Sequence, residues 1–281
     1  MADPTGKNSP TRPRGALFAR LDYAWRIVGT GLSWVIFALA ALTLALVVLP
    51  LSRLFHRARG TESGADLRAQ RTIHRWARAY LALMETFRVL ELRTAEVQAL
   101  RVGGPHLIAA SHPTLLDVVY LLSVLPQADC IVSSARADNL FLTGVARAAG
   151  YLRNDSGQAA IDECAKRLAQ GRTVIIFPEG TRSPAGAIGP LMRGVARIAL
   201  QAGCDIQPVL ITSNPPALAK GQKWYDIPER RFTVVLRALE PISTAAACEA
   251  VRDRSARRSI AARALTAELR ESFAKGLEIV A

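Results

Sequence analysis

Residues 107 to 117 read Leu-Ile-Ala-Ala-Ser-His-Pro-Thr-Leu-Leu-Asp, a short apolar run that passes directly into a polar turn. The run from Leu107 to Ala110 predicts a buried strand, and Pro113 suits the first position of a helix. His112 would then lie in the turn and Asp117 one turn into the helix. A strand that feeds a helix in this way is the repeating unit of an α/β fold.

His112 and Asp117 are a candidate catalytic pair. An imidazole can remove a proton near neutral pH, and a carboxylate bonded to its other nitrogen fixes the tautomer and stabilises the cation. Residues five positions apart do not share a face of a continuous helix, but the turn makes the contact feasible. The helix N-terminus also disfavours extra positive charge, which helps to keep the base neutral.

After Leu90 the chain alternates short apolar runs with helical periodicity, which predicts an α/β domain with a mixed, mostly parallel sheet flanked by helices. The expected strands are 107–110, 130–133, 173–177, 206–212 and 232–238, and the expected helices are 113–125, 140–149, 159–170, 191–202 and 255–277. In such sheets ligands collect at the carboxyl ends of the strands, where His112 lies.

A second polar turn follows the strand at 173–177 and reads Phe-Pro-Glu-Gly-Thr-Arg-Ser over residues 177 to 183. Gly180 lets the backbone approach a ligand or adopt a positive φ, Thr181 offers a hydroxyl, and Arg182 offers a forked donor matched to phosphate. Glu179 would repel a phosphate. We therefore expect it to pair with Arg182 or to bind an acceptor hydroxyl.

Two other arginines are weaker candidates. Arg153 lies in the polar segment 149–155 and is a second potential phosphate ligand. Arg193 precedes an apolar helix in a segment that otherwise has the composition of a core.

A membrane segment is expected near the N-terminus. Residues 27 to 52 carry no charged side chain, and this length is enough to cross a bilayer. A cleaved signal peptide is less favoured, because the apolar core is long and an Arg-rich amphipathic segment follows it. Basic residues flank both sides, so the positive-inside rule gives no orientation, and a helix and a helical hairpin both stay open.

A strongly periodic helix is expected next, with Ile73, Trp76 and Tyr80 on its apolar face and Arg71 and Arg75 on the other. The favoured interpretation is a core-packing helix with a solvated face. The alternative is an interfacial helix whose arginines lie among lipid headgroups.

Composition narrows the class of partner. The net charge is +13, but only 5 of the 36 basic residues are lysine. This charge favours membrane headgroups, phosphorylated substrates or an acidic carrier protein. A nucleic-acid partner is not expected, since zinc-finger spacing, RNA-binding aromatic motifs and basic heptads are missing from the sequence. The four cysteines are widely spaced, so neither a metal nor a disulfide is expected, and a reducing compartment fits.

The motifs at 112–117 and 177–183, with the Gly150–Arg153 segment between them and the Pro208–Val209 strand after them, together resemble the glycerolipid acyltransferase family. The best-known members of that family are 1-acylglycerol-3-phosphate O-acyltransferases. The resemblance spans roughly residues 107 to 212.

The resemblance implies that His112 is the general base for an acceptor hydroxyl and that Asp117 orients it. It further implies that Glu179, Gly180, Thr181 and Arg182 bind the acceptor, usually through its phosphate, together with Arg153. The acyl donor would be acyl-CoA or acyl-carrier protein, with no resident cofactor. Together with the composition of the N-terminal region, this predicts a disordered basic tail at 1–25, a membrane segment at 26–54 and an acyltransferase domain at 60–281, at the inner membrane and facing the cytoplasm.

The chain also departs from the usual family pattern. Ser111 stands where the family commonly has Asn, and the segment 133–138 lacks the Lys that often follows the second strand. These differences keep other acceptors open, such as an ornithine lipid or a polyene lipid. A non-catalytic membrane adaptor with the same fold is the alternative from another class.

Overall fold

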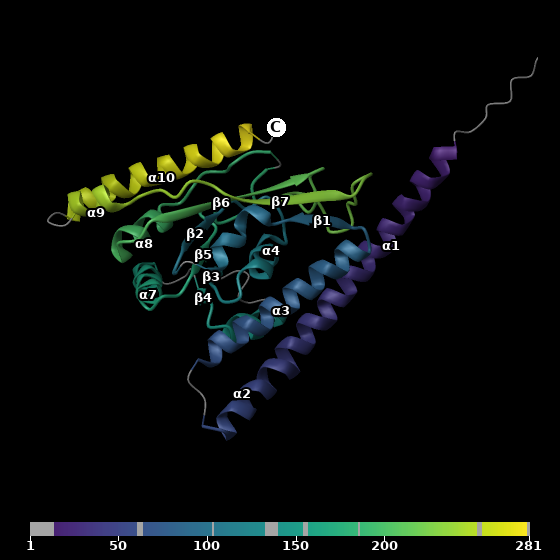
Figure 1. Cartoon of the computed structure of the whole chain (residues 1–281), viewed down its shortest axis with the longest axis horizontal. Coiled ribbons are helices and arrows are strands. Elements are labelled where there is room, and N and C mark those ends of the chain that lie inside the picture. Colours follow the sequence, from purple (N-terminus) through teal and green to yellow (C-terminus); the bar gives the residue numbers. More distant parts are fainter. Residues whose placement is uncertain are drawn as a thin grey trace, which may run out of the picture.

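The computed structural model describes residues 14–60, 64–102, 104–132, 140–153, 157–184, 186–251 and 255–279. Its centre is a 7-stranded sheet with the strand order β1-β7-β6-β2-β5-β3-β4 (Figure 1). The strands are β1 Leu90–Arg93, β2 Leu107–Ala110, β3 Asp129–Val132, β4 Leu152–Arg153, β5 Val174–Ile176, β6 Ile206–Asn214 and β7 Phe232–Ala238.

Strand directions confirm the mixed, mostly parallel sheet. β6, β2, β5, β3 and β4 run parallel to one another, whereas β7 is antiparallel to β6 and β1 is parallel to β7. β2 lies between β5 and β6, with Ala109 opposite both Ile176 and Pro208. Covered on both faces, β2 is apolar throughout, as parallel strands usually are.

Helices cover the two faces of the sheet and bury separate apolar cores. Ile108 and Ala110 of β2 belong to one core, and Leu107 and Ala109 belong to the other, because successive side chains of a strand point to opposite faces. The first core contains residues of α3 Ala65–Thr86 and α4 Asp117–Val124, with α6 Leu140–Ala148 at its margin. The second contains α7 Gln158–Ala169, α8 Gly194–Ala202 and α10 Ser255–Glu278; η2 Ala95–Arg101 and α9 Ala245–Val251 are shorter connecting helices.

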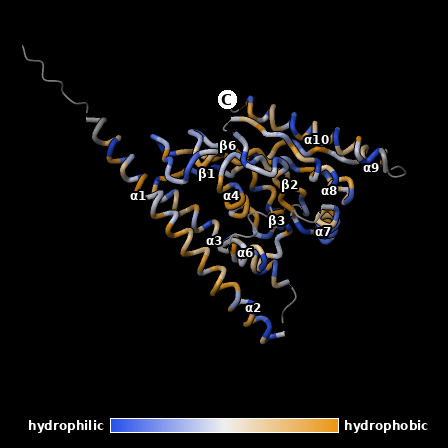
Figure 2. Tube along the Cα trace, turned by 180° about the vertical axis from the view of Figure 1, so that it is seen from behind, coloured by the Kyte–Doolittle hydropathy of each residue, from blue (hydrophilic) through white to orange (hydrophobic). Residues whose placement is uncertain are grey.

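The N-terminal segment is one helical rod. α1 Arg14–Thr43 continues through a π-helical turn, η1 Leu44–Val48, into α2 Leu49–Ala58. Figure 2 shows apolar residues along most of this rod, which by length and composition could cross a membrane. Pro50 stands in the first turn of α2, where its missing N–H is tolerated, so the chain does not reverse between residues 14 and 58.

The rod starts earlier than the membrane segment that the sequence predicts. Residues 14 to 25, expected to belong to a disordered tail, are helical, and residues 1–13 lie outside the described residues. Helical structure is stabilised there by contacts that only the fold supplies. Trp25 donates a hydrogen bond from Nε1 to the carbonyl of Phe87 at 2.9 Å, and the buried Arg26 donates to the carbonyl of Pro228 at 2.9 Å.

The rod packs against the domain along much of its length (Figure 1). Phe37 contacts the rings of Trp76 and Tyr80 on α3, and further along Arg53 donates to the carbonyl of Ala148 at 3.2 Å. Tyr80 of α3 is buried in the first core, as expected of a core-packing helix. The outer face of the rod stays uncovered, and its exposed apolar side chains include Val28, Leu32, Val35, Leu39, Leu46 and Leu54.

Two helices begin later than their sequence patterns predict. α4 begins at Asp117 rather than Pro113, because the Asp117 carboxylate accepts a hydrogen bond from the Thr114 N–H and holds the preceding residues in a turn. α8 begins at Gly194 rather than residue 191, because the Met192 N–H donates to the Pro178 carbonyl at 2.7 Å. At α4 a local side-chain contact replaces the first turn of helix, and at α8 a contact with a distant turn does so.

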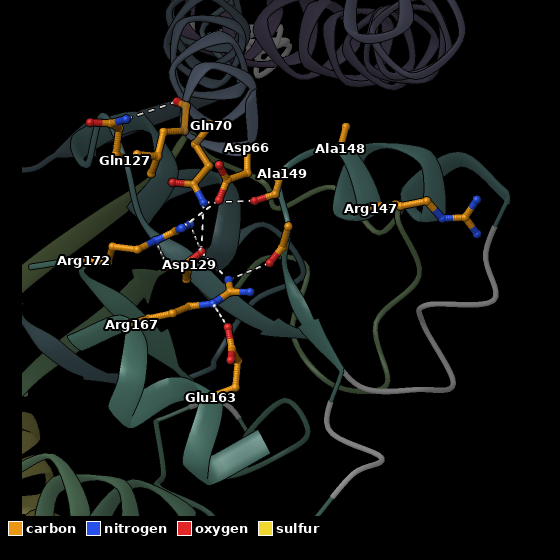
Figure 3. A network of polar contacts seen from close by, with 12 residues as sticks. Asp66, Gln70, Gln127, Asp129, Arg147, Ala148, Ala149, Glu163, Arg167 and Arg172 are labelled. Carbon is orange, nitrogen blue, oxygen red and sulfur yellow. Dashed lines mark hydrogen bonds and ion pairs between the residues drawn. The ribbon is translucent and has the colours of Figure 1, made fainter. Parts of the chain in front are cut away.

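A polar network joins α3 to the amino ends of β3 and β5 (Figure 3). Asp129, fully buried, accepts hydrogen bonds from Nη1 of Arg167 at 2.6 Å, from Nε and Nη2 of Arg172 at 2.7 Å each, and from Nε2 of Gln70 at 2.9 Å. Arg172 also donates from Nη1 to Asp66 at 2.7 Å. The network therefore stabilises the packing of α3 and α7 on the sheet.

Candidate active site

His112 and Asp117 form the pair that their spacing predicts. His112 Nδ1 lies 2.7 Å from Asp117 Oδ2, and both residues are buried, with 5% and 0% of their surface exposed. β2 ends two residues before His112, and α4 begins at Asp117, so strand and helix together fix the contact. With Nδ1 occupied by the carboxylate, Nε2 is the nitrogen left to receive a proton.

Thr114 completes the environment of Asp117 and was not predicted as a site residue. Its backbone N–H donates to Oδ2 at 2.8 Å, and its hydroxyl donates to Oδ1 at 2.5 Å. Burial raises the pKa of Asp117, and the hydrogen bonds with His112 and Thr114 act in the opposite direction. Thr-x-x-Asp has the spacing of a capping box, a pattern that could have identified Thr114.

Glu179 links the two motifs. Its Oε1 accepts a hydrogen bond from the backbone N–H of His112 at 3.0 Å, and its Oε2 accepts from the Gly189 N–H at 2.8 Å and from the Ser183 hydroxyl. The Ser183 N–H in turn donates to the His112 carbonyl at 2.8 Å. The expected pairing with Arg182 is wrong, because these donors from nearby turns surround the buried carboxylate instead.

Arg182 holds a neighbouring loop. Its Nη1 donates to the carbonyls of Leu218 and Ala219, both at 2.9 Å, and the Leu115 N–H donates to the same Leu218 carbonyl at 3.1 Å. Arg182 is therefore close to the turn that carries His112. This loop contact is a second feature that the sequence pattern did not indicate.

Gly180 has a backbone conformation that favours glycine. The next residue, Thr181, is exposed. The φ of Gly180 is +65°, and a Cβ at this position would lie 2.4 Å from Cε of Met192. The backbone conformation therefore favours glycine, whereas the contact is with the end of the flexible, exposed Met192 side chain, which could move aside.

A cavity of about 700 Å³ opens at His112. Its lining is mostly apolar and extends from the N-terminal rod and α3 past α4 and β3 to the beginnings of α7 and α8. Trp34 and Phe37 line it from α1, together with Trp76 from α3, and Gly180 and Met192 line it near the second motif. The contribution of α1 to the cavity was not predicted, because its apolar composition gives no signal for packing beside the turn that carries His112.

Arg153 lies apart from this group. It ends β4 at the edge of the sheet, its side chain is exposed, and it is not part of the cavity lining. Residues 133–138, where the sequence lacks the expected Lys, lie outside the described residues. Across the described ranges, no cluster of three or more His, Cys, Asp or Glu side chains is placed to hold a metal ion.

Comparisons with known proteins agree with this geometry. Residues 91–212 match the family model named Acyltransferase. The mouse 1-acyl-sn-glycerol-3-phosphate acyltransferase alpha is 32% identical over 50% of this chain and 50% of its own length. The 1-acyl-sn-glycerol-3-phosphate acyltransferase of Helicobacter pylori is 29% identical over 40% of this chain and 50% of its own length.

The fold itself has a solved counterpart. The crystal structure of the 1-acyl-sn-glycerophosphate (LPA) acyltransferase PlsC from Thermotoga maritima superposes with a TM-score of 0.64, covering 93% of this chain and 97% of that chain at 17% identity. At this identity the likeness shows a shared fold. The chain spans about half the length of the curated relatives it matches.

Proposed function

We propose that the region matching the Acyltransferase family model, residues 91–212, transfers a fatty acyl group from a thioester donor to a hydroxyl of a lysophospholipid such as 1-acylglycerol-3-phosphate. One observation carries the proposal. The His112–Asp117 pair, joined at 2.7 Å, borders a mostly apolar cavity of about 700 Å³. A base and a compartment for an acyl chain thus lie side by side.

In the proposed reaction His112 acts as general base through Nε2. It takes the proton of the acceptor hydroxyl while the hydroxyl oxygen attacks the thioester carbonyl. The tetrahedral intermediate then collapses, the carbon–sulfur bond breaks, and the leaving thiolate takes the proton back from the imidazolium. Asp117 stabilises that imidazolium, and the products are an ester and a free thiol without any covalent acyl-enzyme.

Glu179 and Arg182 have different parts in this proposal. Glu179 holds the backbone of His112 from a separate turn, so it positions the base and does not touch the acceptor. Arg182 uses Nη1 for the loop carbonyls, while its Nε and Nη2 have no hydrogen-bond partner among the described residues. These two nitrogens form a forked donor suited to the acceptor phosphate.

The membrane arrangement that we propose is a rod lying along the bilayer surface. Trp25 and Arg53 both contact the domain, and 28 residues of helix separate them by about 42 Å, more than the ~30 Å hydrocarbon core. A rod perpendicular to the bilayer would draw the attached domain, including the exposed Arg71 and Arg75 on α3, into hydrocarbon. The uncovered apolar face, which includes Leu32 and Leu39, would instead enter one leaflet.

The central test replaces the base. His112→Ala should lower kcat by at least about 10²-fold, the lower limit for a general base, when membranes receive a labelled acyl donor and a panel of lysolipids. His106→Ala is the matched control, since His106 precedes the same strand at its other end and should keep full activity. Equal product from wild type and His112→Ala would contradict the mechanism and favour a non-catalytic adaptor.

The acceptor is tested through Arg182. Arg182→Gln should raise KM for 1-acylglycerol-3-phosphate by about tenfold or more, because it removes charge-assisted hydrogen bonds. The KM for an uncharged monoacylglycerol should not change. An equal loss with both acceptors would mean that Arg182 acts through the loop at Leu218 and not through a phosphate.

A further inference from the structure

A second cavity, of about 410 Å³, lies where α7, α8 and the beginning of α10 meet. Unlike the first cavity it is rich in polar side chains, and three exposed arginines line it: Arg193, Arg197 and Arg258. We call this cavity the arginine groove. The proposed acyl transfer chemistry does not use it, although Arg193 already stood out in the sequence as a polar residue in an otherwise apolar segment.

Charge in the groove is not neutralised locally. Arg197 donates from Nη2 to Oε1 of Gln158 at 2.7 Å, and the amides of Gln158 and Gln201 donate to Asp162 at 2.8 and 2.6 Å. These amide hydrogen bonds lower the pKa of Asp162, which therefore stays ionised. Among the described residues, the groove is thus lined by three guanidinium groups and no carboxylate, and Asp162 is connected to it only through the amides of Gln158 and Gln201.

Two of the three arginines have no side-chain partner within the ranges that the structure describes. Arg193 and Arg258 make no ion pair or side-chain hydrogen bond with any described residue. α7 and α8 also begin here, and neither helix has a side-chain hydrogen bond at its N-cap, so their first turns add positive potential. The groove therefore has an excess of donors directed at solvent.

The groove adjoins the cavity that contains His112. Ile161 and Arg197 line both cavities, so a ligand crossing this boundary would reach from the arginines toward the base. The apolar walls from α1 and α3 lie at the other end of the first cavity, on the opposite face of the sheet from α7 and α8. An elongated ligand with an acyl chain at one end and several phosphates at the other matches this order of surfaces.

We propose that the arginine groove binds the phosphates of a coenzyme A thioester and thereby selects it as the acyl donor. The proposal rests on the proposed function. Coenzyme A has a diphosphate and a ribose phosphate beyond its pantetheine arm, and several phosphates suit three guanidinium groups. The arm of a carrier protein has one phosphate, which would leave most of these donors unused.

The kinetic test compares two donors that share the acyl group. Arg193→Gln combined with Arg258→Gln should raise KM for acyl-CoA by at least about tenfold and leave KM for the phosphate-free acyl-pantetheine unchanged. Arg270→Gln, further along the exposed side of α10, is the matched control and should change neither value. An unchanged KM for acyl-CoA, or an equal rise for both donors, would overturn the proposal, as would a wild type that uses only the acyl-carrier protein.

A binding measurement separates this proposal from the proposed function. Calorimetric titration of the full-length His112→Ala protein with coenzyme A should show binding that the double Arg193→Gln and Arg258→Gln change weakens by tenfold or more. Such binding supports the groove even if wild type transfers no acyl group, in which case only the proposed function fails. Transfer with no dependence on these arginines would overturn the groove alone.

A lipid headgroup is the other source of phosphate, and vesicles distinguish it. Sedimentation with phosphatidylglycerol vesicles should be the same for wild type and the double arginine variant. If the variant loses vesicle binding while its affinity for coenzyme A is unchanged, the groove is a membrane contact and the proposal is wrong.

Discussion

Asp117 and Asp129 are both fully buried carboxylates, yet they lie at opposite ends of the parallel strands and have partners of different kinds. Asp117 follows β2 at its carboxyl end and accepts from a histidine and a threonine. Asp129 begins β3 at its amino end and accepts from two arginines and a glutamine (Figure 3). A buried carboxylate alone therefore does not mark a catalytic position.

The partners decide what each carboxylate can do. A guanidinium group does not exchange its charge in acid–base chemistry, so the charges that Arg167 and Arg172 place beside Asp129 do not change during a reaction. An imidazole can accept and release a proton, so the charge beside Asp117 can change during a reaction. Of the side chains that bond to these two carboxylates in the described structure, His112 is the one that lines the cavity of about 700 Å³. One carboxylate thus stabilises packing, and the other is placed to stabilise a transient cation.

The largest expected effect separates activity from stability at Asp117. Asp117→Asn should lower kcat by about 10⁴-fold, because an amide no longer fixes the tautomer of His112 or stabilises its cation. Since burial raises the pKa of Asp117, the folded state holds its proton more tightly than the unfolded state, and the ionised form opposes folding at neutral pH. The unfolding free energy should therefore change by no more than about 1 kcal/mol.

Steady-state kinetics and urea unfolding of the same preparation check this prediction. A loss of activity that follows a comparable loss of stability would contradict it. Asp117 would then resemble Asp129, and the contrast between the two carboxylates would fail.

The second effect is on stability. Asp129→Ala should lower the unfolding free energy by about 3 to 5 kcal/mol, because Arg167 and Arg172, with 13% and 18% of their side chains exposed, would lose a shared buried partner. Glu163→Gln is the control. Glu163 pairs with the same Arg167, but its side chain is 38% exposed, so its loss should cost less than about 1 kcal/mol. Equal costs for the two variants in urea unfolding would show that burial does not distinguish them.

The sequence predicted the strands next to both Asp117 and Asp129. It predicted the contact of Asp117 with His112 but not the polar network around Asp129. Five of the strands begin and end within two residues of their expected limits, because long apolar runs are covered on both faces of a sheet. β1 and β4 were not predicted, because β4 has two residues and β1 follows a helix whose apolar pattern runs into it.

At the candidate site, sequence spacing predicted the contact between residues that are close in the chain. His112 and Asp117 lie five residues apart, and a single turn brings them together. The contacts of Glu179 with the His112 backbone and of Arg182 with Leu218 join segments 67 and 36 residues apart, so no spacing rule could predict them. The Asp129 network joins Asp66 to Arg172 across 106 residues and was missed for the same reason.

A third prediction refines the role of the donors at Asp117. Thr114→Val removes the hydroxyl that donates to Oδ1 at 2.5 Å and should lower kcat by about 10- to 100-fold, the equivalent of one hydrogen bond to a charged group. KM for the acceptor should not change, because Thr114 acts through Asp117. Thr114→Ser keeps the hydroxyl and should restore most of the rate. A Ser variant as slow as the Val variant would mean that the methyl group, and so packing, is what matters at Thr114.

The smallest expected effect is at the margin of the Asp129 network. Burial alone would raise the pKa of Asp66, but the hydrogen bond and charge of Arg172 outweigh it and lower the pKa below its usual value. A carboxylate with a lowered folded pKa stabilises the fold above its unfolded pKa, and this stabilisation is lost as the pH falls through the folded pKa. Asp66→Asn should therefore lower the unfolding free energy by up to about 1 kcal/mol at pH 7, because the side chain is 32% exposed and the pair is partly screened.

Urea unfolding of the wild type and of Asp66→Asn, from pH 7 to below the folded pKa of Asp66, checks this prediction. The difference in unfolding free energy should disappear at low pH, since protonated Asp66 and Asn are then equivalent. A difference that persists at low pH would mean that Asn disturbs the packing of α3 and that the ion pair with Arg172 contributes little.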